Sequence, residues 1–310
     1  MDVLALQGLG SSPIDSAITI GAFDGVHLGH QALLAELKTQ AAKLQLRSVV
    51  LTFDRHPAAL LRPDRAPKIL TSLDAKLELL EATGIDATLV LPFDKTRSEE
   101  SPADFVDSVL TPLGAKLVLV GSNFHFGKDR AGTTSTLADL GQSRGFSLHP
   151  FDLKADEVDP ISSTRIRSLI AAASVEDAAR LLGRAHRLDG EVVHGAGLGG
   201  ATLGYPTVNL DLGSSVALPA DGVYAGRYRH EDGSWSMAAI SVGRRPTFYE
   251  DAEPLVEAYL LDFTGDLYGS KACLEIHRHL RPELKFEGIE PLKAQMALDV
   301  AKTREFMAAR

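Results

Sequence analysis

The stretch AITIGAFDGVHLGH, residues 17–30, runs from a short apolar segment through a glycine-containing turn into a helical pattern. The apolar run at residues 17–20, which ends in such a turn, predicts a buried strand, and the spacing of residues 31–44 predicts a helix after it. Further candidate strands lie at residues 47–53, 86–91, 116–121 and 146–151, with candidate helices between them at 74–83, 102–110 and 136–144. This alternation indicates an α/β domain with a parallel sheet covered on both faces.

A change of pattern near residue 185 predicts a second domain. Runs typical of strands then follow without intervening helices, at residues 191–194, 207–210, 223–229, 236–242, 255–262 and 271–279. Closely spaced strands broken by Gly, Pro and Asp indicate an antiparallel barrel or sandwich, and a terminal helix contains Leu292 and Phe306. A length of 310 residues also suits two domains. We place them at residues 1–185 and 186–310.

Composition limits the classes of protein to which the chain can belong. The formal charge is −9, from 32 basic and 41 acidic residues, and neither half is basic, which argues against a general nucleic-acid binder. No window approaches the 18 apolar residues of a membrane span. The single cysteine, Cys273, cannot form an internal disulfide, which fits a reducing compartment, and we expect it to be a small core residue. We expect a soluble, cytoplasmic protein. Because the chain has no broad basic surface, we expect individual binding sites to hold any anionic ligands, and the sequence does not indicate the oligomeric state.

The turn at residues 21–30 has the composition of a phosphate site. His27 and His30 are three residues apart at a helix start and can share one face, while Gly25 and Gly29 let backbone amides approach an anion. Such groups can stabilise charge on phosphate oxygens during attack at phosphorus. Metal binding by the two histidines is the alternative, but no third ligand is adjacent.

A second helix start, SSTRIR at residues 162–167, is rich in hydroxyls. Its simplest interpretation is a helix cap, in which Ser or Thr oxygens accept hydrogen bonds from free amides. Hydroxyls followed by Arg165 and Arg167 also make a phosphate clamp. The presence of the histidine turn earlier in the chain favours the clamp.

The second half carries two further candidate features. The glycine-rich stretch HGAGLGG, residues 194–200, precedes LGYPTVNL at 203–210. The glycines are consistent with either a hairpin loop or a phosphate-binding loop. After them, Thr207 and Asn209 can offer side-chain oxygens to a hard cation. In LVEAYLLDF at 255–263, strand alternation separates Glu257 from the apolar face. Glu257 is either an exposed carboxylate on the barrel surface or a general base for an alcohol.

Together these motifs resemble the bacterial bifunctional riboflavin kinase/FAD synthetases. The adenylyltransferase half is similar in GAFDGVHLGH, TFDRHP (52–57), GSNFHFG (121–127) and SSTRIR, and the kinase half in DGVY (221–224), GRRPT (243–247) and DLYG (266–269). The resemblance implies a Rossmann-like nucleotidyltransferase domain followed by a six-stranded antiparallel barrel. It implies phosphorylation of riboflavin to FMN, then transfer of AMP from ATP to FMN with release of pyrophosphate, both assisted by Mg2+.

The resemblance also implies roles for residues of the first domain. His27 and His30 would contact the ATP phosphates, Ser163, Thr164 and Arg165 would clamp them, and Asn123 would hold nucleotide or metal. Asp54 and His125 stand where Glu and Arg are expected, so they are carried over only as part of the pocket wall. The remaining nucleotide-binding candidates of this domain are Gly21, Phe23, Asp24, Gly25 and Gly29.

In the second domain the resemblance implies that Thr207 and Asn209 hold the Mg-nucleotide and that Glu257 is the base. Leu198 and Ala201 occupy loop positions where basic residues are expected, which should weaken the attraction for nucleotide. The remaining binding candidates are Gly195, Gly197, Gly199, Gly204, Tyr205, Pro206 and Arg245.

Two other functions remain open at this point. One is another adenylyltransferase of the same superfamily, with a barrel that only assists; the motifs that resemble the kinase argue against it. The other is a non-catalytic or single-activity flavin-binding protein, which would bind flavin without consuming ATP.

Overall fold

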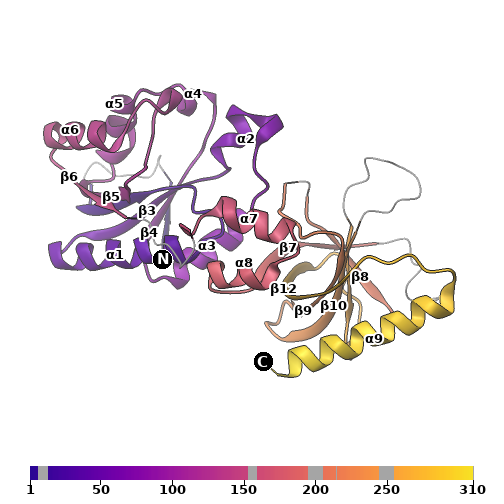
Figure 1. The fold of residues 1–310 in the computed structure, drawn as a ribbon. Coiled ribbons are helices and arrows are strands. Elements are labelled where there is room, and N and C mark those ends of the chain that lie inside the picture. The colour runs from indigo at the N-terminus through magenta and orange to yellow at the C-terminus, as the bar shows by residue number, and fades with distance from the viewer. Residues whose placement is uncertain (6–12, 153–158, 195–204, 214, 244–254, 310) are drawn as a thin grey trace. The chain divides into compact units, whose positions relative to one another are not determined.

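A computed structural model describes residues 1–5, 13–152, 159–194, 205–213, 215–243 and 255–309. Its contacts form two compact units (Figure 1): Met1–Pro67 with Leu73–Ser162, and Lys68–Ser72 with Ser163–Arg310. Helices α7 (Ser163–Ala171) and α8 (Val175–Leu182) therefore group with the second unit. A functional boundary at residue 185 stays a prediction.

The first unit is built on a six-stranded sheet in the order β1-β4-β3-β2-β5-β6, with every pair parallel. Five of these strands were predicted within a residue of their ends, whereas β1 contains only three residues and shows no pattern of its own. The strands are β1 (Asp2–Leu4), β2 (Ser16–Ile20), β3 (Arg47–Phe53), β4 (Ala87–Leu91), β5 (Ala115–Gly121) and β6 (Ser147–Phe151).

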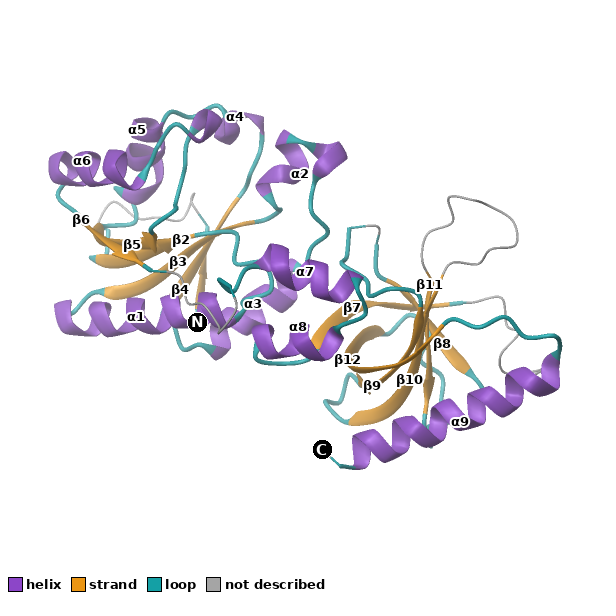
Figure 2. Cartoon of the chain, viewed as in Figure 1, coloured by secondary structure: helices purple, strands orange, loops and turns teal. Residues whose placement is uncertain are grey.

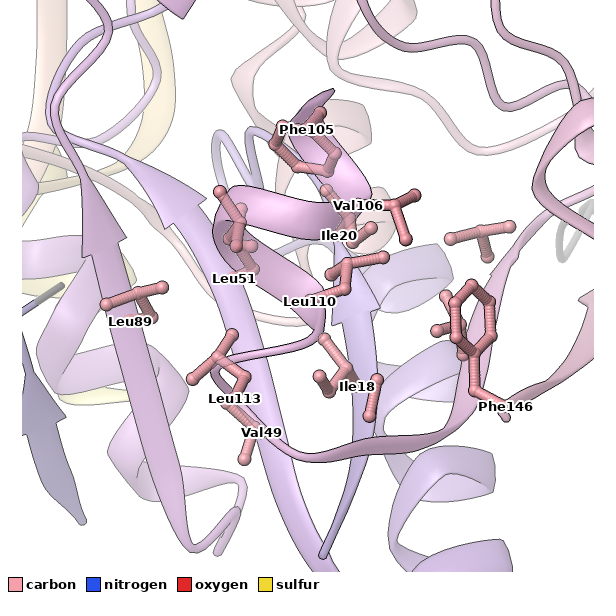
Figure 3. Packing of buried hydrophobic residues seen from close by; sticks show 14 of the residues in the cluster. Ile18, Ile20, Val49, Leu51, Leu89, Phe105, Val106, Leu110, Leu113 and Phe146 are labelled. Atoms are coloured by element: carbon pink, nitrogen blue, oxygen red, sulfur yellow. The ribbon is translucent and has the colours of Figure 1, made fainter. Parts of the chain in front are cut away.

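Helices cover both faces of this sheet, as predicted (Figure 2). On one face, α1 (Leu28–Leu44) buries Leu34 and Leu37 against Val50. On the other face, the helical segment around Phe105 packs over the strands (Figure 3). The predicted helix at 102–110 is divided into α5 (Pro102–Phe105) and a π-helical turn (Val106–Leu110). The other helices are α2 (Pro57–Leu61), α3 (Leu73–Ala82), α4 (Lys95–Ser98) and α6 (Thr134–Arg144).

The strand order reverses at β2. From β2 the chain proceeds to β3 and β4 on one side, and it later returns to place β5 on the other side. Ligands of open parallel sheets bind beyond the carboxyl ends of the strands at such a reversal. The turn at residues 21–30 and the loop that follows β5 are therefore the expected binding edge.

The second unit contains a closed barrel in the order β10-β11-β8-β7-β12-β9, with antiparallel pairs throughout. The predicted fold class, with barrel and terminal helix α9 (Ile289–Ala308), is confirmed. Large interior side chains include Tyr224 and Tyr228. The strands are β7 (His186–Val193), β8 (Thr207–Asp211), β9 (Gly222–Arg229), β10 (Trp235–Gly243), β11 (Leu255–Leu260) and β12 (Lys271–Pro282).

The buried Cys273 and the attachment of the terminal helix are two local features of this unit. Cys273 is buried, which raises the pKa of its thiol to about 12 and keeps it protonated at neutral pH. Helix α9 is held to β12 by the charge pair of Arg281 and the buried Asp299, 2.7 Å between Nη2 and Oδ2. In the described residues no helix has the length and hydropathy to span a membrane.

Candidate active sites

The turn after β2 is buried and conformationally unusual. Gly21 continues the sheet by donating its N–H to the carbonyl of Leu51, at 3.0 Å. Phe23 and Val26 have φ angles of 48° and 37°, a region that bulky and β-branched side chains rarely adopt. The Val26 carbonyl accepts a hydrogen bond from Nε2 of Gln31, at 2.9 Å. The surrounding contacts thus hold a strained turn in one shape, which is a feature of binding sites.

The two histidines of this turn are in direct contact. The backbone N–H of His30 donates to Nδ1 of His27, 3.3 Å away, and this bond caps α1. The rings stack with their centroids 3.6 Å apart and their planes 16° from parallel. A Cβ atom at Gly29 would lie 3.1 Å from the His27 ring, so the glycine leaves the ring its place. The Phe23 ring lies 5.0 Å from His30 on another side.

Burial and hydrogen bonding determine the protonation of this pair. Because Nδ1 of His27 accepts a hydrogen bond, the proton of the neutral ring lies on Nε2. Desolvation, with smaller contributions from His27 and Lys76, holds the pKa of His30 well below its usual 6.5. Nδ1 of His30 is buried and meets no hydrogen-bond partner within the described ranges. The site therefore offers neutral imidazoles, each with one N–H donor.

The metal alternative for these histidines gains no support. Within the residues that the structure describes, no group of three or more His, Cys, Asp or Glu side chains is placed to hold an ion. Asp24 and Gly25 are buried in the same turn. The first backbone amides of α1 are the groups that helix-start anion sites use, and anion binding at this turn stays a prediction.

Residues after the neighbouring strands line the same edge of the sheet. Asn123 follows β5 and is exposed, and its carbonyl oxygen lies 2.9 Å from Nδ1 of His125. Asp54 follows β3, and its Oδ1 accepts a hydrogen bond from the N–H of Phe93 at 2.9 Å. The exposed Asn123 side chain is available to a ligand, whereas Asp54 supports the wall.

Ser163, Thr164 and Arg165 begin α7, which belongs to the second unit. Thr164 is exposed, while Ser163 and Arg165 are half-buried. The hydroxyls and the guanidinium stand at a helix start, as the sequence pattern indicated. Their role as a phosphate clamp stays a prediction.

Sequence reasoning missed Lys76, which lies on α3 and is only 8% exposed. Its Nζ donates to the carbonyl oxygens of Phe53, at 2.9 Å, and Ala22, at 3.3 Å. The sequence did hold one sign that Lys76 is buried. It lies four residues before the buried Leu80 and therefore on the side of α3 that otherwise carries apolar residues.

In the barrel, strand register joins two of the predicted residues. Asn209 of β8 lies opposite Glu257 of β11, and Thr207 lies opposite Tyr259. Side chains directly opposite each other in an antiparallel pair share a face, with Cβ atoms about 5 Å apart. Val256, Ala258 and Leu260 point into the core, so the predicted alternation around Glu257 is confirmed.

The Asn209 side chain is unusual in this group. The residue is 6% exposed, and its Oδ1 is buried with no hydrogen-bond partner in the part of the chain that the structure describes. Glu257 is half-buried, Pro206 is exposed, and the Tyr205 ring meets Tyr259 edge-on at 5.0 Å. The other predicted residues of this site lie outside the described residues: Gly195, Gly197, Gly199, Gly204 and Arg245, with Leu198 and Ala201.

Comparison with known proteins agrees with this arrangement. A family model described as FAD synthetase matches residues 10–165, and one described as riboflavin kinase matches residues 182–307. The chain belongs to the riboflavin kinase/FAD synthetase family.

Relatives match it over nearly their whole length. Two proteins named bifunctional riboflavin kinase/FMN adenylyltransferase are each 38% identical: that of Listeria monocytogenes over 95% of this chain and 93% of its own, and that of Pseudomonas fluorescens over 94% and 92%. A solved structure from Streptococcus pneumoniae, titled macrolide-efflux protein, superposes with a TM-score of 0.86 at 30% identity. It covers 98% of this chain and 99% of that one.

Protonation of His30 should appear in the pH dependence of stability. Because its pKa is lowered on folding, the unfolded state binds more protons once the pH falls below about 6.5, and the free energy of unfolding should decrease there. The decrease should level off once the pH falls below the pKa of the folded state. We expect His30→Gln to reduce this decrease between pH 7.5 and 5.5, measured by urea unfolding.

His149→Gln is the control, because the His149 side chain is 42% exposed in the same unit. It should leave the pH dependence as in the parent protein. An unchanged pH dependence in His30→Gln would contradict the burial argument.

Proposed function

We propose that the chain is a bifunctional flavin enzyme that phosphorylates riboflavin to FMN and adenylylates FMN to FAD, using one ATP in each step. The observation that carries the proposal is the stacked pair of the buried His27 and the half-buried His30 at the carboxyl end of β2, in a chain matched by both family models. The efflux title of one similar structure is not transferred, because both models and the curated relatives describe flavin enzymes.

In adenylyl transfer, an oxygen of the FMN phosphate attacks the α-phosphorus of ATP. A new P–O bond forms, the bond to the bridging oxygen breaks, and pyrophosphate leaves. The FMN phosphate is already ionised at neutral pH, since the second pKa of a phosphomonoester is about 6. The site therefore needs hydrogen-bond donors rather than a base, and His27, His30 and the first amides of α1 supply them.

Riboflavin phosphorylation makes a different demand, because the nucleophile is a primary hydroxyl. Its proton must leave as the 5′-oxygen attacks the γ-phosphorus of ATP and ADP departs. Glu257 is proposed as the acceptor of that proton, and its half-buried position opposite Asn209 keeps it beside the predicted nucleotide site. The cross-strand register supports this assignment.

Mg2+ is proposed as the metal of the kinase step. The buried, unpartnered Oδ1 of Asn209 and the hydroxyl of Thr207, two residues away on the same face of β8, are the hard oxygen ligands that Mg2+ prefers. When bound, the ion would neutralise charge on the ATP phosphates. A role of Asn123 in holding nucleotide or metal is proposed for the first unit.

The setting of the reaction is also proposed. A cytoplasmic location is supported by the single cysteine, which suits a reducing compartment. Riboflavin, FMN, FAD and ATP are the proposed ligands. No nucleic-acid partner is proposed, because neither half of the chain is basic.

The two activities should fail separately. His30→Ala should lower FAD formation from FMN by about 100-fold or more, because it removes a donor to the transition state. Glu257→Gln should lower FMN formation from riboflavin by about 100-fold or more, because it removes the base. Chromatography of each half-reaction measures both rates.

Each variant serves as the other's control, since it should keep the activity of the intact site. Unchanged FAD synthesis in His30→Ala would refute the first assignment. Unchanged FMN synthesis in Glu257→Gln would refute the second.

Removal of the buried oxygen ligand should change the metal requirement of one step only. Asn209→Ala should raise the Mg2+ concentration needed for half-maximal FMN formation, with FAD formation unaffected, in titrations at fixed ATP. An unchanged Mg2+ requirement for FMN formation would show that Asn209 is not a ligand.

A further inference from the structure

Lys76 is a buried cation that the mechanism above does not use. Its Nζ donates to the carbonyl of Phe53, the last residue of β3, and to the carbonyl of Ala22 in the turn after β2. Burial lowers the pKa of the ammonium, while Asp24 and Asp54 oppose that change and favour the charged form. An ammonium buried between two strand ends is costly to desolvate and calls for an explanation.

We propose that Lys76 is a positioning residue for adenylyl transfer: its ammonium fixes the peptide between Ala22 and Phe23 and places a positive charge against the turn that leads to His30. This inference rests on the adenylyltransferase activity proposed above and adds a residue to it.

The first part of the inference is geometric. The Ala22 carbonyl accepts two hydrogen bonds, from Nζ of Lys76 at 3.3 Å and from Oγ1 of Thr52 at 3.2 Å. Because a peptide is planar, fixing its carbonyl also fixes the direction of the next N–H, here that of Phe23. Phe23 then turns to a φ of 48° and places its ring 5.0 Å from His30. Lys76 and Thr52 thus set the start of the strained turn that ends in His27.

The second part is electrostatic. The charged or titratable groups that act on His30 are His27, from the same turn, and Lys76, from α3. Both disfavour a proton on the His30 ring, as does burial. Two imidazoles stacked at 3.6 Å would repel each other if both were charged, so the ammonium helps keep the pair neutral and stacked. The neutral pair keeps its donors in place for the phosphate.

Lys76→Met in the full-length chain tests both parts, because it removes the charge and keeps most of the side-chain length. We expect kcat for FAD formation from FMN and ATP to fall about 10- to 100-fold, the size of effect that misplaced catalytic groups produce. The pKa of His30, followed by NMR through its ring C–H resonances, should rise. FMN formation from riboflavin in the same sample should be unchanged.

Lys38→Met is the matched control. Lys38 is a half-buried lysine of the first unit whose Nζ, like that of the buried Lys76, donates to a backbone carbonyl, that of Thr83, at 2.6 Å. Its loss should leave both kcat for FAD formation and the pKa of His30 as in the parent chain.

Thr52→Val separates the two parts without removing a charge. It deletes the other donor to Ala22 while it keeps the shape of the side chain. We expect a lower kcat for FAD formation with an unchanged pKa of His30. This variant also keeps the inference open to refutation should Lys76→Met fold poorly.

Four results would overturn the inference: a parental kcat in Lys76→Met, an unmoved His30 pKa in that variant, a parental kcat in Thr52→Val, or an equal loss of kcat in Lys38→Met. Failure of the underlying function is distinguishable, because the parent chain itself would then form no FAD. A parent chain that forms FAD beside a fully active Lys76→Met would refute the role of Lys76 alone.

Discussion

All five residues of β2 are buried between two parallel neighbours, and this constraint decides where the chemistry of the first unit lies. Because the strand order reverses at β2, the chain that leaves it enters the edge of the sheet where ligands bind. The chain must then turn within a few residues into α1, and the strained backbone at Phe23 and Val26 accomplishes that turn. This tight turn brings His27 and His30 into contact at the start of α1.

The two units answer two different chemical demands of the proposed reactions. A flavin phosphate is already a nucleophile, so the proposed task of His27 and His30 is only to donate hydrogen bonds, and the lowered pKa of His30, which keeps its ring neutral, suits that task. A flavin hydroxyl needs a base, and the barrel supplies a carboxylate opposite a buried amide. Neither site depends on a broad basic surface, which explains how a chain of charge −9 can handle phosphates.

Much of this could be predicted from the sequence, because strands and helices of the first unit show clear periodicity and the histidine turn is local. Other features depend on partners distant in sequence. The strand β7 begins at His186, earlier than predicted, because residues 186–191 pair with β12, and Gly190 lies inside the strand where a Cβ atom would meet the Asp211 carbonyl. The pairing of Asn209 with Glu257 requires the register of two strands, and the role of Lys76 appears only where its helix meets two strand ends.

The most direct test is a time course of the flavin pool in the presence of the full-length protein, riboflavin, ATP and Mg2+, followed by chromatography. If phosphorylation at one site is followed by adenylylation at the other, we expect riboflavin to decline, FMN to rise and then fall, and FAD to accumulate as the final product. Riboflavin that stays unchanged, or FMN that accumulates without any FAD, would contradict the account.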